Sequence, residues 1–148
     1  MAEAVFLVEM SAPPSRVIEA LSTLGGLTSW WTTDIDGSAS EGAEMSLGFP
    51  DAPARFALEV DEAGDAVVQW TSVGAFPPHW TGTKIRFTLM PGDDGGTRLF
   101  FEHTGFAAAD PALGHTAFTW ANLMNSLKGF CETGRPSPLL TGPRETQS

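Results

Sequence analysis

Tyrosine is absent from this sequence, and cysteine occurs once, as Cys131. No mechanism can therefore rest on a phenol, no internal disulfide can form, and cysteine usage does not point to secretion. Long hydrophobic runs are also missing, because Glu3 and Glu9 interrupt the apolar N-terminal stretch and no basic segment precedes it. This pattern fits neither a signal peptide nor a membrane span. We expect a cytoplasmic protein with no membrane partner.

Positive charge is scarce as well, since 8 lysines and arginines face 18 aspartates and glutamates and leave a net charge of −10. Phosphate backbones would repel such a chain, so we expect no nucleic-acid partner. The length of 148 residues, 42% of them hydrophobic, suits one globular domain. We place this domain at residues 1–134, treat residues 135–148 as an extended tail, and expect a monomer or a homodimer.

The predicted strands share a period-two alternation of apolar and polar residues, which is typical of an antiparallel sheet with one covered face. One such segment lies near the N-terminus and five follow in the middle of the chain: residues 4–10, 44–49, 54–60, 66–72, 83–89 and 97–103. Composition predicts a loop over residues 34–44 and a hairpin turn over residues 61–65.

Two short helices are predicted after the first strand. Residues 11–14 contain two prolines and form a turn that leads into the first helix. Gly25 and Gly26 indicate a break, after which a second short helical turn carries Trp30 and Trp31.

A long C-terminal helix is predicted to begin after the N-cap Asp110, with Pro111 in its first position, and to stop at Gly134. Its apolar residues recur at steps of three and four. An antiparallel sheet with one apolar face needs a cover, and this helix is the only element able to supply it. The sequence therefore predicts an α+β fold, with a curved antiparallel six-stranded sheet wrapped around a long C-terminal helix and two short helices after the first strand.

Five motifs, in this order, resemble the START-like (SRPBCC, helix-grip) superfamily, and within it the branch named after the activator of heat-shock-protein-90 ATPase. They are SAPPSRVIEAL, LTSWW, HWTGTKIRFTL, GGTRLFFEHTGF, and the stretch from Trp120 through NLMNSLKGFCETG, and the resemblance covers residues 4–134. It implies a helix-grip fold with a cavity beneath the long helix that holds apolar or amphipathic small molecules. It implies no single activity, because most members of this branch lack an assigned reaction.

Aromatic side chains are the strongest sign of a ligand site. Any one of them suits a core, but together they exceed what a small core needs, and clustered rings with few polar groups grip a flat or greasy ligand. We therefore predict a site for a hydrophobic small molecule between the sheet and the long helix, with residues 74–80 and 103–110 at its mouth. The predicted lining is Trp31, Phe56, Leu58, Trp70, Phe76, Trp80, Phe87, Phe101, His103, Phe106, Trp120 and Met124.

His103 is the one candidate for chemistry in this lining, because alternation with Leu99 and Phe101 points it toward the cavity. It is interpreted either as a core-edge histidine satisfied by a backbone carbonyl, or as a polar anchor or general base that meets a ligand carbonyl or phenol. The histidines lack metal-ligand spacing, and no phosphate loop is present, so we expect no metal and no cofactor. Cys131 is interpreted as a buried apolar residue rather than a nucleophile.

Three functions follow from this pattern, and binding without an assigned reaction is the first. The second is a cyclase/aromatase-like or hydrolase-like enzyme in the same cavity that uses His103, alongside Asn122. The third is a co-chaperone-type interaction module. It ranks lowest because we expect a lone domain without the additional chaperone-binding domain of true activators.

Trp30 and Trp31 pose a separate question, because neighbouring residues on a helix point about 100° apart. We expect Trp30 to fill the core between the short helices and the sheet, and Trp31 to lie nearer the cavity rim. Alanine at the core member should cost about 3–5 kcal/mol. Alanine at the rim member should disturb ligand binding more than stability.

Overall fold

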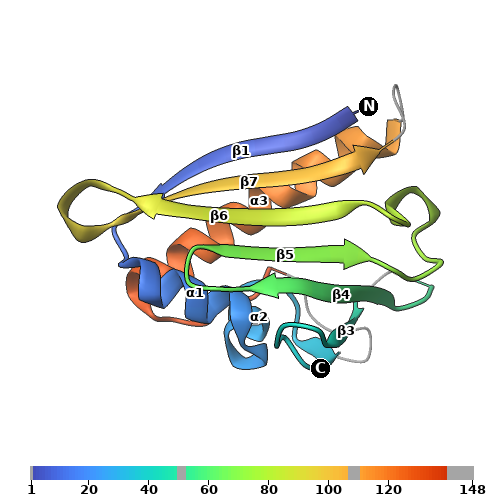
Figure 1. The fold of residues 1–148 in the computed structure, drawn as a ribbon, viewed down its shortest axis with the longest axis horizontal. Coiled ribbons are helices and arrows are strands. Elements are labelled where there is room, and N and C mark those ends of the chain that lie inside the picture. Colours follow the sequence, from blue (N-terminus) through green and yellow to red (C-terminus); the bar gives the residue numbers. More distant parts are fainter. Residues whose placement is uncertain (1, 50–52, 107–110, 140–148) are drawn as a thin grey trace.

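The computed structural model describes residues 2–49, 53–106 and 111–139, with the side chains of residues 2 and 111–115 left aside. The strands form one seven-stranded antiparallel sheet in the order β1-β7-β6-β5-β4-β3-β2, and the long helix α3 lies across one of its faces (Figure 1). No helix of the described residues is long and apolar enough to cross a membrane.

The elements follow the chain in an order that opens with one strand and two short helices and closes with the long helix. They are β1 (Ala2–Met10), α1 (Pro14–Ser22), α2 (Leu24–Trp30), β2 (Asp34–Gly37), β3 (Glu44–Gly48), β4 (Phe56–Ala63), β5 (Val67–Ser72), η1 (Pro78–Trp80), β6 (Lys84–Pro91), η2 (Asp93–Gly95), β7 (Thr97–Phe106) and α3 (Pro111–Thr133).

The predicted α+β helix-grip fold is confirmed, but the count of six strands is wrong by one. The additional strand is β2, inside the predicted loop, where Asp34–Gly37 pairs with Met45–Gly48 of β3. Its aspartates and glycine are typical of a loop, so the sequence pattern did not indicate a strand. A short edge strand is held by backbone hydrogen bonds, and charged side chains on it prevent pairing with other chains. The predicted turn at residues 61–65 also begins too early, since β4 continues through a bulge between Val60 and Glu62 as far as Ala63.

The predicted break at Gly25 and Gly26 is wrong, because both glycines lie inside α2. The boundary between the two short helices is Thr23, whose hydroxyl accepts a hydrogen bond from the backbone N–H of Gly26 at 2.9 Å. A threonine at this position satisfies one of the free N–H groups at a helix start. Gly26 then allows α2 to approach α1, since a Cβ on it would stand 2.6 Å from the backbone of Ala20.

Neighbouring glycines in α2 therefore give opposite expectations. Gly26→Ala should lower the free energy of unfolding by about 1–3 kcal/mol, because the added methyl overlaps the α1 backbone. Gly25→Ala should raise it by up to about 1 kcal/mol, since nothing lies within 4 Å of that Cβ and alanine favours a helix. Urea denaturation of the two variants checks both signs, and a loss at Gly25 equal to that at Gly26 would show that the close approach to Ala20 is not what makes glycine necessary at residue 26.

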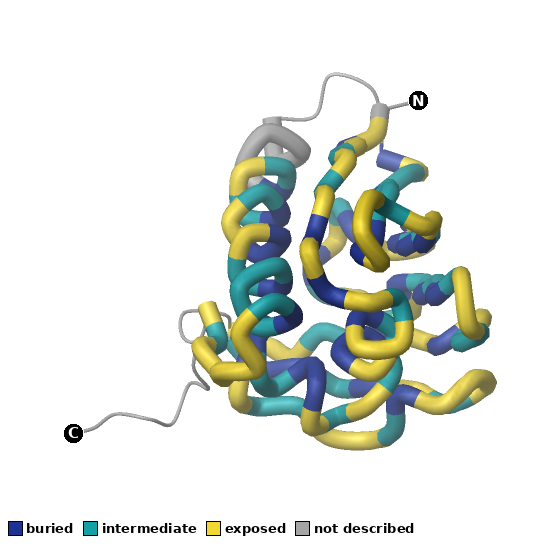
Figure 2. Tube along the Cα trace, turned by 90° about the vertical axis from the view of Figure 1, so that its left-hand side faces the viewer, coloured by how far each residue is buried: buried dark blue, intermediate teal, exposed yellow. Residues whose placement is uncertain are grey.

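The core lies between α3 and the facing side of the sheet, as the buried inner surface and exposed outer surface of α3 show in Figure 2. α3 ends at Thr133, and Gly134 follows with a φ of 75° and a hydrogen bond from its N–H to the carbonyl of Phe130. The predicted stop is thus confirmed. Its predicted N-cap, Asp110, lies outside the described residues.

Candidate functional site

The inner face of the sheet and the facing side of α3 bring the predicted lining together. Ten of those twelve side chains are buried, and Phe56 and Phe76 are partly exposed. Leu58 and Met124 pack in the same core as the rings. Phe6 and His79 touch single rings at the edge of this region, Phe101 and Phe106 respectively. The twelve other rings in contact form what we call the aromatic cluster: Trp30, Trp31, Phe49, Phe56, Trp70, Phe76, Trp80, Phe87, Phe101, His103, Phe106 and Trp120.

Trp120 of α3 is the centre of the aromatic cluster. Its ring lies 4.6 Å from that of Phe101 on β7 and 5.3 Å from that of Trp31, and it stacks on Trp80 at 6.2 Å. These distances are those of direct ring contact. The rings of α3 and of the sheet are therefore in direct contact in the region beneath α3, where the resemblance implied a cavity.

The aromatic cluster reaches the surface at three partly exposed rings, Phe49, Phe56 and Phe76, which we call the rim. Phe56 joins them, because its ring lies 4.6 Å from Phe49 and 5.4 Å from Phe76, in both cases edge to face. Phe76 belongs to one of the two predicted mouth loops. In the other, Phe106 is buried, and residues 107–110 lie outside the described residues.

Trp30 and Trp31 are both buried, and their rings stack at 5.7 Å with an interplanar angle of 16°. The expectation that they point in different directions is wrong. Trp31 follows the last residue of α2 and has a non-helical backbone (φ −104°, ψ −86°), so the helical offset between neighbours no longer applies. Trp30 is fixed by a hydrogen bond from its Nε1 to the carbonyl of Ala20 at 2.9 Å. Trp31 instead contacts Phe49 of the rim, at 6.1 Å.

His103 is fully buried on β7, and both of its ring nitrogens have partners. Nε1 of Trp120 donates to Nδ1 at 3.0 Å, and Nε2 lies 2.8 Å from the hydroxyl of Thr83. That hydroxyl has a single proton and donates it to the carbonyl of Trp80 at 2.6 Å, so His103 must carry its own proton on Nε2. The ring is a neutral imidazole with no nitrogen free.

Desolvation is the main cause that lowers the pKa of His103, to about 3, and the nearby His79 lowers it further. A base with so low a pKa is unprotonated throughout the physiological range. The geometry agrees with the interpretation of a core histidine, although side chains rather than a backbone carbonyl satisfy its ring. Thr83 carried no sign of this role in the sequence.

The five indole N–H groups of the protein divide into two kinds. Trp30, Trp80 and Trp120 each donate a hydrogen bond, with Trp80 reaching the hydroxyl of Thr116 at 3.3 Å. Nε1 of Trp70 is buried and has no hydrogen-bond partner among the residues that the structure describes. Trp31 also donates no hydrogen bond from its indole within the described residues. These last two rings stack on each other at 5.6 Å with an angle of 17°.

The other reactive side chains lie apart from one another. Burial raises the pKa of the Cys131 thiol to about 12, which keeps it protonated. His79 is partly buried near Thr116, and the side chain of His115 lies outside the described residues. Within the described residues, no three His, Cys, Asp or Glu side chains are grouped to hold a metal ion.

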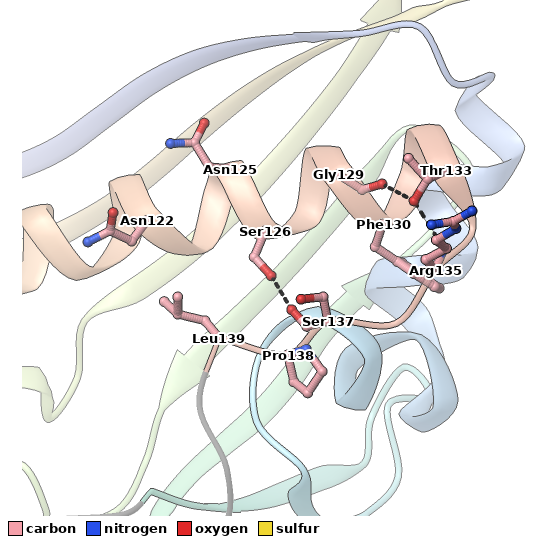
Figure 3. Close-up of a pocket in the computed structure, with 10 residues that line it drawn as sticks. All are labelled: Asn122, Asn125, Ser126, Gly129, Phe130, Thr133, Arg135, Ser137, Pro138 and Leu139. Atoms are coloured by element: carbon pink, nitrogen blue, oxygen red, sulfur yellow. Dashed lines mark hydrogen bonds between the residues drawn. The ribbon is translucent and has the colours of Figure 1, made fainter.

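A groove of 550 Å³ runs along the outer side of α3 and is bounded by the segment that follows it (Figure 3). Asn122 and Asn125 line it from the exposed surface of α3. The interpretation of Asn122 as a partner of His103 is therefore wrong, because Asn122 lies on the solvent side of the helix whose buried side carries Trp120. The hydroxyl of Ser126 lies 3.0 Å from the carbonyl of Ser137 and ties the two walls together.

Residues 11–132 match the family model described as "Activator of Hsp90 ATPase homolog 1-like protein". The chain is 29% identical to the protein in "Solution structure of the Aha1 dimer from Colwellia psychrerythraea", with 90% of this chain and 98% of that chain covered and a TM-score of 0.81. No curated protein matches the sequence.

Two further solved structures share the fold at lower identity. Protein MLL2253 from Mesorhizobium loti is 21% identical, with 86% of this chain and 95% of that chain covered and a TM-score of 0.72. CalU16 from Micromonospora echinospora is 18% identical, with 91% and 76% covered and a TM-score of 0.71. Similarity at this level extends to the arrangement of the sheet around α3.

Proposed function

The chain belongs to the Activator of Hsp90 ATPase homolog 1-like family, and from that premise we propose that it binds a hydrophobic, aromatic small molecule in the aromatic cluster between the sheet and α3. The rim at Phe49, Phe56 and Phe76 is the proposed entrance, since there the cluster meets solvent. The proposed lining is the set of twelve residues predicted from the sequence, extended by Trp30 and Phe49.

The unpaired N–H of Trp70 carries this proposal. Its Nε1 is buried in an aromatic region and no hydrogen-bond acceptor reaches it. Leaving a buried donor unpaired costs about 1–3 kcal/mol, which natural cores usually avoid. A molecule that brings an oxygen acceptor into the cluster removes that cost. We therefore expect the ligand to combine a flat apolar body with one carbonyl or ether oxygen.

His103 favours binding over the enzyme alternative. A cyclase/aromatase-like or hydrolase-like reaction needs a group that takes up or releases a proton, but both nitrogens of His103 are engaged and its pKa is lowered to about 3. We propose that His103 forms part of the wall and orients Trp120.

The first test is a matched pair of probes. 2-Acetylnaphthalene carries a carbonyl oxygen, and 2-isopropenylnaphthalene has nearly the same shape without it. We expect the first to bind about tenfold more tightly, the worth of one hydrogen bond. Titration of the ¹⁵N-labelled protein measures both affinities. The ring of either probe should shift the indole N–H signal of Trp70, but only 2-acetylnaphthalene should add the downfield shift of a new hydrogen bond.

Trp70→Phe is the matched control, because it keeps a ring and deletes the donor. The preference for 2-acetylnaphthalene should vanish in this variant while 2-isopropenylnaphthalene binds as before. If neither naphthalene binds, and tryptophan fluorescence also stays unchanged across flavonoid, fatty-acid and polyketide panels, the proposed function is wrong. Recovery of a chaperone in a pulldown would instead support the co-chaperone alternative.

We also propose an oligomeric state and a cellular location for this protein. The similar Colwellia protein is described as a dimer. In this chain the edge strand β1 exposes 43% of Val5 and 56% of Leu7, which favours a homodimer over a monomer. We propose a cytoplasmic location from the single, buried Cys131.

A further inference from the structure

Three tryptophan rings form a stack at the heart of the aromatic cluster, with Trp31 in the middle. Its ring lies 5.7 Å from Trp30 at an angle of 16° and 5.6 Å from Trp70 at 17°. Trp30 and Trp70 therefore present two faces that are nearly parallel to the ring between them. Near-parallel indole faces of this kind suit the stacking of a flat aromatic ring.

The two outer rings of the stack are held firmly. Trp70 lies on β5, between the hydrogen-bonded strands β4 and β6. The indole of Trp30 donates its N–H to the carbonyl of Ala20. The Trp30 carbonyl accepts a hydrogen bond from the N–H of Leu139 at 3.3 Å and lies 2.8 Å from the hydroxyl of Ser126, whose proton it shares with the carbonyl of Ser137. These contacts fix the backbone of both residues, and the ring of Trp30 as well.

The middle ring is held by ring contacts alone, which include Trp120 at 5.3 Å and Phe49 at 6.1 Å besides its two stacking partners. Within the described residues the Trp31 indole makes no hydrogen bond. Its backbone is anchored, because its N–H bonds to the carbonyl of Leu27 at 2.9 Å, but it stands at the end of α2, where no further helical turn confines the side chain. Rotation of this side chain would break no hydrogen bond among the described residues, and Phe49 of the rim is one of the rings that it already contacts.

From this asymmetry we infer that Trp31 holds the place of the ligand's own ring. A flat aromatic molecule displaces it toward the rim and stacks between Trp30 and Trp70. The exchange replaces one buried aromatic ring by another, so the ligand restores the stacking that Trp31 gives up. This inference rests on the proposed function and specifies its ligand as a planar ring system and its entry step as the displacement of Trp31.

Hydrogen exchange of the indole N–H groups tests the displacement in the unmodified protein. The ¹⁵N-labelled protein is saturated with 2-acetylnaphthalene, and the signals of Trp30 and Trp31 are assigned with Trp30→Phe and Trp31→Phe. We expect the Trp31 N–H to exchange with water at least tenfold faster in the complex, because its ring then meets solvent. The Trp30 N–H should keep its protection, since its bond to Ala20 is unbroken.

Affinity gives a second readout. Trp31→Ala removes the ring that must be displaced and should bind 2-acetylnaphthalene at least tenfold more tightly than the unmodified protein, with Trp31→Phe between the two. Leu27→Ala is the control for a cavity made elsewhere, because Leu27 is fully buried on the same helix, and it should change the affinity less than twofold. If Trp31→Ala does not fold, the affinity of Trp31→Phe and the exchange rate of the Trp31 N–H still test whether the ligand displaces Trp31.

The outcomes separate this inference from the proposed function. Binding of the probe to the unmodified protein while Trp31 stays protected, or equal affinities for it and the Trp31 variants, would overturn the displacement and leave the proposed function standing. No binding to the unmodified protein would overturn both, and binding to Trp31→Ala alone would do the same, because it would mark the site as a man-made cavity.

Discussion

Trp120→Ala is expected to lower the free energy of unfolding by about 4–6 kcal/mol. Most of this loss is packing, because the ring contacts Trp31 and Phe101 across the interface between α3 and the sheet. The remainder is the unpaired Nδ1 of His103, which loses the donor at 3.0 Å. Natural domains are stable by about 5–15 kcal/mol, so this variant should be close to unfolding. Denaturation followed by far-ultraviolet circular dichroism measures it without relying on indole emission.

Two control variants divide this effect. Trp120→Phe keeps a ring and deletes the donor, so it should lose about 1–3 kcal/mol. Phe118→Ala removes an aromatic ring from the same helix, but that ring is 70% exposed, and its loss should stay within about 0.5 kcal/mol. A small loss for Trp120→Ala, similar to that of Phe118→Ala, would mean that α3 is not packed on the sheet as described.

His103 should make the protein less stable in acid by about 3 kcal/mol between pH 7 and pH 4. Its folded-state pKa of about 3 lies below the ordinary histidine value of 6.5, chiefly because of desolvation. Between these two values the histidine is protonated in the unfolded chain and neutral in the folded chain. The stability that neutral His103 contributes is therefore fully present above pH 6.5. It is lost as the pH falls from 6.5 toward the folded-state pKa, and the loss levels off near pH 3.

The comparison of wild type with His103→Gln isolates this contribution, because the carboxylates titrate equally in both. Chemical denaturation at several pH values should show that the stability of His103→Gln falls by about 3 kcal/mol less on going from pH 7 to pH 4. Parallel curves for the two proteins would mean that His103 accepts a proton in the folded state and is not sealed in the core.

The fold was predictable wherever side-chain periodicity carried the information. The alternation in residues 83–89 and the apolar spacing around Trp120 located β6 and α3. β2 was missed because its side chains are polar and only backbone pairing with β3 makes it a strand. The start of α2 was missed because Gly26 was interpreted as a helix break. A glycine is needed there because a Cβ would stand 2.6 Å from the backbone of Ala20, and no local sequence pattern contains this contact between two helices.

The candidate site was predictable as a set of residues but not as an arrangement. Alternation showed which rings face inward, and for Phe49 the same alternation with Met45 and Leu47 carried the signal, although it was not included in the predicted lining. The stacking of Trp31 between two other indoles depends on a single non-helical backbone position after α2. Likewise, the pairing of His103 with Thr83 and Trp120 joins β7, the loop before β6, and α3.

The stack of Trp30, Trp31 and Trp70 also has an optical consequence. Stacked indoles at such separations couple their electronic transitions. Where the transition moments of neighbouring rings are skewed within their planes, this coupling should give a paired positive and negative band in the far-ultraviolet circular dichroism. Departure of the middle chromophore uncouples the outer two, and the paired band then collapses without any label. The three tryptophans can thus report the proposed displacement of Trp31 spectroscopically, without a label.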